Sequence, residues 1–99
     1  MSLHITVDES QLAAFCLKHR LTKLAFFGSV LTDEFGPDSD VDVLFEYDQR
    51  HPLTLLGVVR MEREFGELLG RKVDMRTAED LSRYFREEVL RTALVQYAA

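Results

Sequence analysis

The sequence predicts a small α/β (α+β) domain of two layers, in which helices pack on a mixed sheet. Short apolar segments typical of strands alternate along the chain with segments of helical periodicity, and this alternation is characteristic of such folds. The 99 residues, of which 46% are hydrophobic, suffice for one modest core. Glycine and proline lie at several boundaries between the segments. Residues 1–99 are therefore predicted to form a single domain.

A helix over residues 9–20 is the first predicted element. Asp8 precedes it and Gln11 follows three residues later, a spacing that resembles a capping box. Cys16 lies on the apolar face of this helix, so we expect it in the core. A single cysteine excludes an internal disulfide and agrees with a reducing cytoplasm. A buried strand is predicted next, over residues 23–27.

The centre of the chain contains the clearest amphipathic pattern. A short helix or turn is predicted over residues 28–34, and the apolar run at Val41–Tyr47 predicts the second strand. Residues 53–69 have apolar side chains at helical spacing, which predicts a long amphipathic helix. Gly70 follows directly and is the residue type that most often ends a helix in the left-handed conformation.

The last third of the chain is less regular. Residues 72–75 predict a third strand, and Thr77 is expected to cap a helical region that continues to about Arg91 with a break near Phe85. Residues 94–97 allow two interpretations, an extension of this helix or a short edge strand.

The most informative motif is Gly28-Ser29 followed at close range by Asp40-Val41-Asp42. Residues i and i+2 of a strand lie on the same face, so the two carboxylates are expected to point the same way. Carboxylates so close repel each other unless a cation lies between them, and Mg²⁺ favours one or two carboxylates together with substrate phosphates. The turn at Gly28-Ser29 offers backbone N–H groups to a phosphate. The motif therefore predicts a site for a metal-bound triphosphate.

Each part of this motif also has an ordinary structural explanation. An isolated Asp-x-Asp is usually a solvated strand end, and Gly-Ser is a common turn dipeptide. The order of the parts makes the pattern specific: a strand, Gly-Ser, a short polar segment, then Asp-x-Asp at the start of another strand. Asp74 adds a third carboxylate within the predicted third strand.

The distribution of charge excludes some classes of partner. The net charge is −5. Residues 33–48 contain several acids and no lysine or arginine, whereas basic residues are frequent from Arg60 to Arg91. This acidic balance argues against nucleic acid as the main partner. The sequence has no apolar run of about 20 residues, and its N-terminus lacks the pattern of a secretion signal. We therefore expect a cytoplasmic protein without a membrane partner.

At this point the chain resembles the minimal nucleotidyltransferases, a family within the polymerase-β-like nucleotidyltransferase superfamily whose small single-domain members are often antitoxin-type partners of HEPN proteins. The resemblance covers nearly the whole chain. Four blocks support it: Phe27-Gly28-Ser29, PDSDVDVL at residues 37–44, LLGRKVD at residues 68–74, and YFREEVL at residues 84–90.

The resemblance implies the nucleotidyltransferase fold, with the strand of Asp40 and Asp42 next to the strand of Asp74. It implies that these three carboxylates are catalytic and bind two Mg²⁺ ions, while Gly28 and Ser29 bind the phosphates of ATP. The implied reaction moves AMP from ATP to an acceptor hydroxyl, with a tyrosine of a HEPN toxin as the expected acceptor.

Two other functions remain open from the sequence. The chain is either such an enzyme, a non-catalytic module that neutralises a HEPN partner by binding, or an enzyme that adenylylates a small molecule. Its oligomeric state is also open, and a homo-oligomer is one alternative.

One departure from the family pattern bears on this choice. Many members have arginines just after Gly-Ser, where this chain has Val30, Leu31 and Thr32. Lys72 and Arg76 flank the third carboxylate and are candidates to supply the missing positive charge; the alternative is that both are solvent-facing charges.

Overall fold

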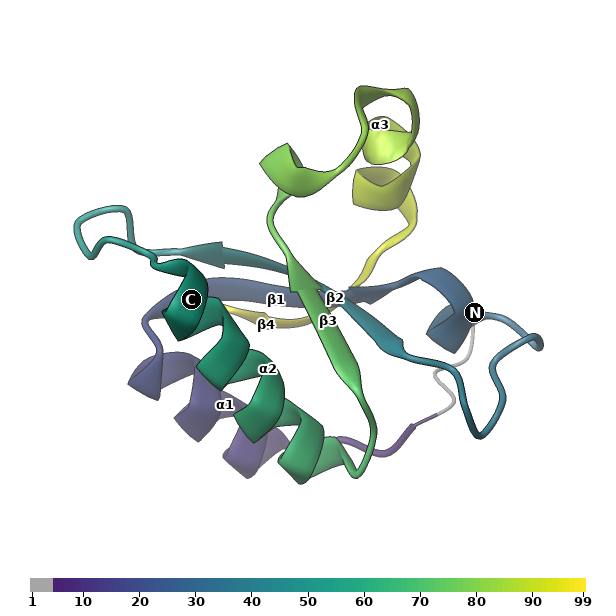
Figure 1. Cartoon of the computed structure of the whole chain (residues 1–99), viewed down its shortest axis with the longest axis horizontal. Helices are drawn as coiled ribbons and strands as arrows, with labels where there is room; N and C mark the ends of the chain where they lie inside the picture. The colour runs from purple at the N-terminus through teal and green to yellow at the C-terminus, as the bar shows by residue number, and fades with distance from the viewer. Residues whose placement is uncertain (1–4) are drawn as a thin grey trace.

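The fold is built on one four-stranded mixed sheet (Figure 1). The computed structural model describes residues 5–99; residues 1–4, which the predicted domain and the search for a secretion signal included, lie outside this range. The strand order is β3-β2-β1-β4. Strands β2 and β4 are antiparallel to β1, and β3 is parallel to β2. The strands are β1 (Leu21–Phe27), β2 (Val41–Tyr47), β3 (Val73–Arg76) and β4 (Leu94–Ala98).

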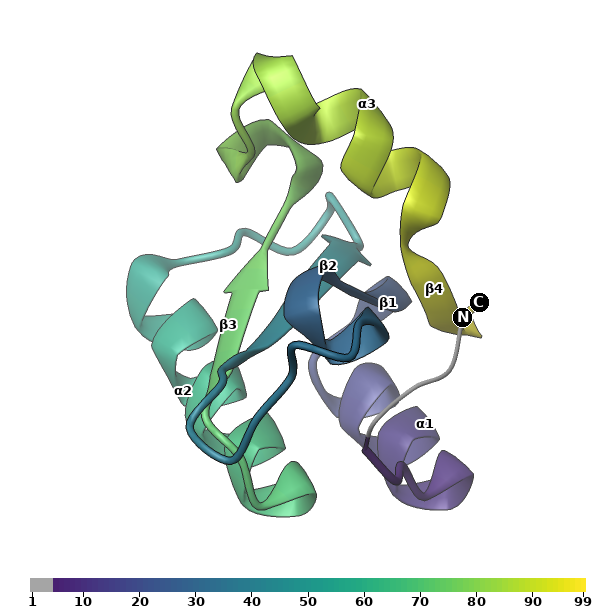
Figure 2. The same cartoon turned by 90° about the vertical axis from the view of Figure 1, so that its right-hand side faces the viewer.

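Three α-helices lie on the two faces of this sheet. Helices α1 (Glu9–Lys18) and α2 (Leu55–Leu69) cover one face together, which confirms the predicted layer of helices on a mixed sheet. Helix α3 (Arg83–Thr92) stands over the opposite face (Figure 2). Two short 3₁₀ helices, η1 (Gly28–Leu31) and η2 (Ala78–Asp80), follow β1 and β3.

The main core lies between the sheet and the α1/α2 layer. The ring of Phe65 from α2 stacks on Phe15 of α1, with 4.8 Å between ring centroids, and lies 6.2 Å from the ring of Phe26 in β1. Alternate side chains of β2 enter the same core because strand residues alternate between faces. Cys16 is fully buried there as predicted, and burial raises the pKa of its thiol to about 11.

Local sequence signals explain where the first two helices begin and end. The Asp8 carboxylate accepts a hydrogen bond from the Gln11 N–H at 2.9 Å, and the Thr54 hydroxyl accepts one from the Gly57 N–H at 3.0 Å. Gly70 has a φ of 68° and ends α2, as predicted. Helix α1 ends at Lys18 rather than at residue 20, because Arg20 takes a positive φ of 58° to start β1.

The region after β3 differs from the prediction in one respect. Thr77 does cap a helical segment, and its backbone N–H donates to the Asp80 carboxylate at 3.1 Å. The break lies at Leu81 and Ser82 instead of near Phe85. Leu81 adopts an extended conformation because its side chain is buried in a second apolar cluster on the α3 side of the sheet.

The C-terminal segment and the outer edge of β3 complete the sheet. Residues Leu94–Ala98 form the edge strand β4, so the second of the two interpretations is correct. At the other edge, the Met75 N–H of β3 donates to Glu62 Oε2 of α2 at 2.8 Å.

Within residues 5–99, none of the helices combines the length and apolar character that crossing a bilayer requires.

Replacing Phe65 with alanine is predicted to destabilise the domain by about 3–5 kcal/mol. The ring is 1% exposed and contacts both Phe15 and Phe26, so its removal leaves a cavity between α1, α2 and the sheet. Urea unfolding followed by circular dichroism measures this change. Leu55→Ala on the same helix is the control, because Leu55 is 83% exposed. Equal effects of both substitutions would contradict this description of the core.

Candidate nucleotide and metal site

The predicted carboxylates lie on the face of the sheet opposite the main core. Val41, Val43 and Met75 point into the core, so the alternate residues Asp42 and Asp74 face the α3 side. Asp42 and Asp74 are also direct neighbours in the parallel pairing of β2 with β3. The expected adjacency of the two strands is therefore confirmed, and it places two of the three predicted ligands side by side.

Two basic side chains accompany the outer carboxylates. Asp74 Oδ2 accepts hydrogen bonds from Arg76 Nε at 3.1 Å and Nη2 at 3.0 Å. Asp40, one residue before β2, is exposed and lies 3.9 Å from Lys72 Nζ. Both cations that the sequence offered as replacements for the missing arginines are thus next to the predicted ligands. The hydrogen bonds that Arg76 donates to Asp74 raise the pKa of the Arg76 guanidinium.

Gly28 connects the turn that is predicted to bind phosphates with the carboxylates. Its φ is 78°, and a Cβ built on it would lie 2.5 Å from Asp42 Oδ2. Only glycine combines this backbone conformation with such a close approach. Since Phe27 pairs with Asp42 across β1 and β2, the turn begins directly beside the carboxylate. The structure therefore brings Gly28 next to Asp42 and Asp42 next to Asp74.

The surroundings of Asp42 disfavour its negative charge. Burial is the largest cause that raises the pKa of this carboxyl, and the charges of Asp74 and Asp40 add to it. Arg76 acts in the opposite direction. A cation placed next to such a carboxylate stabilises its ionised form. The electrostatics therefore fit a site that binds a metal ion.

The three carboxylates do not form a complete metal cage by themselves. Among residues 5–99, no three acidic, histidine or cysteine side chains come together as a metal-binding group. Asp42 and Asp74 share a face of the sheet, but Asp74 is paired with Arg76, and Asp40, which precedes β2, is paired with Lys72. This arrangement fits Mg²⁺, which commonly binds through one or two carboxylates and takes its other ligands from water and substrate phosphates.

The positions after Gly-Ser differ in their relation to this site. Val30 is fully buried and Leu31 nearly so, and both pack into the main core. Thr32 is exposed, and its hydroxyl donates to the Ser29 carbonyl at 2.9 Å. Of the three departures from the family pattern, only Thr32 is therefore at the surface where an added charge reaches solvent.

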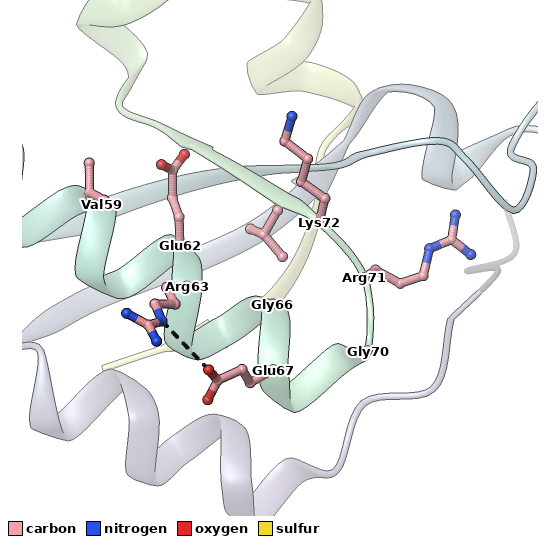
Figure 3. Close-up of a pocket in the computed structure, with 9 residues that line it drawn as sticks. Val59, Glu62, Arg63, Gly66, Glu67, Gly70, Arg71 and Lys72 are labelled. Carbon is pink, nitrogen blue, oxygen red and sulfur yellow. Dashed lines mark ion pairs between the residues drawn. The ribbon is translucent and has the colours of Figure 1, made fainter.

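Arg71 is a residue that the sequence analysis did not single out. Its Nη2 donates to the carbonyl oxygens of Gly36 and Ser39, the latter at 2.9 Å, and its guanidinium lies 4.3 Å from the Phe35 ring centroid. Figure 3 shows this side chain extending away from α2. The bonds fasten the loop that leads to Asp40. They join segments more than 30 residues apart, so no local pattern revealed them.

Two cavities adjoin the site, and another lies beside α2. One of about 300 Å³ includes Phe27 and Gly28, and one of about 630 Å³ includes Asp74 and Arg76. The third, of about 500 Å³, is the groove between α2 and the start of β3 in Figure 3. Its walls include the ion pair between Arg63 and Glu67 but none of the predicted ligands.

Gly28→Ala is predicted to weaken Mg²⁺–ATP binding by about 10- to 100-fold, because the new methyl group displaces the end of the Asp42 side chain. Gly70→Ala is a matched control: Gly70 has a similar positive φ, but a Cβ there meets nothing within 4 Å. Both substitutions should destabilise the fold by about 1–2 kcal/mol. Calorimetric titration should show weaker binding for Gly28→Ala alone; equal affinities would contradict the contact with Asp42.

Asp42→Asn is predicted to stabilise the metal-free protein near neutral pH. Because the native state raises the pKa of Asp42 above its ordinary value of 3.8, ionisation of this group opposes folding, and stability falls as pH rises through that range. The increase in the free energy of unfolding that asparagine brings should therefore be largest at about pH 7 and should shrink toward about pH 4. Urea unfolding in EDTA at both pH values measures it, and a loss of stability at neutral pH would contradict the prediction.

Comparison with known proteins identifies the family to which this chain belongs. A family model for the nucleotidyltransferase domain matches residues 9–95. The Methanocaldococcus jannaschii protein named "Putative protein adenylyltransferase MJ0435" is 28% identical over 92 residues, which span 93% of this chain and 97% of that protein.

Solved structures give the same result for the fold. One described as a "putative minimal nucleotidyltransferase" matches with a TM-score of 0.71 and 32% identity, over 87% of this chain and 86% of that one. A chain in the complex of a tri-AMPylated Shewanella oneidensis HEPN toxin with an MNT antitoxin has a TM-score of 0.65 and 15% identity, over 92% and 70% of the two chains, which shows the fold alone. The chain belongs to the nucleotidyltransferase domain family, and within it to the minimal nucleotidyltransferases.

Proposed function

We propose that this protein moves AMP from ATP to an acceptor hydroxyl, and that the acceptor is a tyrosine of a HEPN-domain protein. One observation carries the proposal: Gly28, directly after β1, lies against Asp42 of β2, and Asp42 is paired with Asp74 of β3. This order matches what the reaction needs, with phosphates at the turn, ligands in the middle and the acceptor at the third carboxylate.

Each residue then has a distinct task. Backbone N–H groups at Gly28-Ser29 bind the phosphates of ATP, while Asp40, Asp42 and Asp74 are the residues that would hold two Mg²⁺ ions. Such ions would supply charge neutralisation and would lower the pKa of the acceptor hydroxyl. The acceptor oxygen attacks the α-phosphorus, the bond to the β-phosphate oxygen breaks, and pyrophosphate leaves. Asp74 takes the hydroxyl proton.

Lys72 and Arg76 supply the positive charge that arginines after Gly-Ser supply in many relatives. Both already lie beside carboxylates of the site, at 3.9 Å from Asp40 and 3.0 Å from Asp74. Once the carboxylates bind metal, these side chains are available to the negatively charged phosphates. Arg76 is the better placed of the two, because it contacts Asp74 within the sheet, whereas Lys72 contacts Asp40, which precedes β2.

A protein acceptor fits the surface next to Asp74. The cavity of about 630 Å³ there extends to Leu55, Val58 and Val59 of α2. Leu55 is 83% exposed, and Leu56 and Val59 are also largely exposed. An apolar surface of this kind next to a reactive group is typical of protein–protein contact. The name of the relative from M. jannaschii and the HEPN toxin complex support the same acceptor class.

A non-catalytic antitoxin is the second candidate, and one observation favours it. Asp40 and Asp74 are each paired with a cation in the protein itself, and the three carboxylates are not assembled into a metal-binding group. A protein that neutralises its partner by binding alone needs no such assembly.

Asp74→Asn separates the two candidates. The substitution keeps the shape of the side chain and removes the charge, so AMP transfer should slow by a factor on the order of 10² or more while ATP affinity changes little. The assay incubates the protein with a HEPN-domain protein of its own organism, labelled ATP and Mg²⁺, and measures the mass of the acceptor. Asp38→Asn, in the exposed loop before Asp40, is the matched control and should leave transfer unchanged.

Three outcomes distinguish the proposals. Transfer by wild type that Asp74→Asn abolishes supports the enzyme and its third carboxylate. Transfer that Asp74→Asn leaves equally fast contradicts the role given to Asp74. A wild type that never changes the acceptor's mass, with or without Mg²⁺, but still neutralises it, is the non-catalytic antitoxin.

A further inference from the structure

A small basic pocket lies at the end of the sheet opposite Gly28. It has a volume of about 210 Å³ and forms where the link between α1 and β1 meets the loop between β2 and α2. In Figure 1 both connections lie at the left-hand end of the sheet, whereas η1, which begins at Gly28, lies at the right-hand end. Four of the lining residues are basic: Lys18, His19, Arg20 and His51. None of them has a role in the site described above.

The acids next to this pocket are occupied by other side chains. Asp48, the carboxylate among the lining residues, accepts hydrogen bonds from the Arg50 guanidinium, the shortest at 2.8 Å. Glu64 of α2 is paired with Lys18 at 2.9 Å and with His19 at 2.6 Å. Neither carboxylate is paired with the guanidinium that lines the pocket.

That guanidinium, of Arg20, contacts a second basic side chain instead of an acid. Arg20 Nη1 lies 2.9 Å from His51 Nδ1, and because a guanidinium can only donate, this imidazole nitrogen accepts. Within the part of the chain that the structure describes, Arg20 forms no ion pair with a carboxylate. An imidazole that accepts in this way does not neutralise the guanidinium. An anion in the pocket would therefore find a positive charge that the protein leaves uncompensated.

The backbone of Arg20 adopts a conformation that favours glycine. Its φ is 58°, and it directly follows the residue that caps the C-terminus of α1, where a left-handed glycine is most common. Gly70 has this role at the end of α2. Any side chain in this conformation costs free energy, so an arginine here indicates a task for the side chain beyond ending the helix.

We propose that this pocket binds a phosphate group, as free phosphate or as the end of a small monoester, with Arg20 as its main ligand and Lys18 and His51 as further donors. The planar fork of N–H donors on arginine matches phosphate oxygens, and a phosphate has enough oxygens for the other donors as well. The volume of about 210 Å³ suits one small anion rather than a larger ligand. Such a site is separate from ATP binding at Gly28-Ser29 and does not depend on the proposed function.

Titration with inorganic phosphate in EDTA, followed by two-dimensional amide NMR spectra, tests this site. Wild type should show saturable shifts of the backbone signals of Arg20 and His51. Arg20→Gly should weaken binding by about 10- to 100-fold, the loss expected for charge-assisted hydrogen bonds. The C-terminal end of α1 is itself unfavourable for an anion, so no other feature of the helix replaces the lost side chain. Acetate should bind at least about 10-fold more weakly than phosphate, because it leaves donors of the pocket unpaired.

Three variants separate ligand binding from folding. Glycine is favoured at the backbone position of Arg20, so Arg20→Gly should keep or raise the midpoint of urea unfolding while it loses phosphate. Arg20→Lys keeps the charge but lacks the planar fork, so it should retain only part of the affinity. Arg63→Gln is the matched control, since it removes one positive charge from an 84% exposed side chain of α2 that does not line the pocket. It should leave phosphate binding unchanged.

Each result supports or overturns the site. Saturable binding that Arg20→Gly abolishes and Arg63→Gln retains supports it, and a comparison with glycerol phosphate then shows whether the monoester or free phosphate binds more tightly. Equal binding by Arg20→Gly, or shifts at Gly28 and Ser29 in place of Arg20, overturns it. Acetate that binds as tightly as phosphate makes the pocket a carboxylate site and also overturns it. If wild type shows no saturable binding, Arg20 serves the fold alone, through its contact with His51.

Discussion

Strand β2 determines the relation between the core and the site. Its side chains alternate, so that Val41, Val43 and Phe45 are buried against α1 and α2 while Asp42 faces the other side. A shift of register by one residue would exchange these two sets and place the carboxylate in the apolar core. The apolar packing that stabilises the domain therefore also holds Asp42 beside Gly28 and Asp74.

The face that carries the carboxylates is itself divided. Ala25, Phe27 and Leu44 form an apolar cluster with Leu81, and α3 rests on this part through Val89. The remaining part holds the charged residues of the site. The boundary between them passes through Phe27 and Asp42, which are paired across the strands. Partial burial at this boundary is what raises the pKa of Asp42, so the same contact that shapes the site also makes its charge unfavourable without a cation.

Much of the fold follows from local signals in the sequence. The bounds of β2, the end of α2 at Gly70 and the cap at Asp8 depend on neighbouring residues, and all three were predicted. The break before α3 was misplaced because it depends on the burial of Leu81 against the sheet, which no local pattern encodes.

The site was predictable to the same extent. Alternation along a strand placed Asp40 and Asp42 on one face, but the partner strand of Asp74 came only from the resemblance to a family. Spacing suggested Lys72 and Arg76 as sources of positive charge, but it did not reveal their ion pairs with Asp40 and Asp74. Arg71, which fastens the loop before Asp40, was missed because its acceptors are distant in sequence. The roles of the carboxylates and of the Gly28-Ser29 turn remain predictions that the proposed experiments test.

The hydrogen bond from the Met75 N–H to Glu62 has a consequence for solubility. Strand β3 lies at one edge of the sheet, and an edge strand presents backbone donors to which a strand of another molecule can add. The Glu62 carboxylate occupies the donor of Met75 and places a negative charge along that edge. The edge next to Asp74 is thereby a poor template for aggregation, although β3 has no further strand beside it in the sheet that residues 5–99 form.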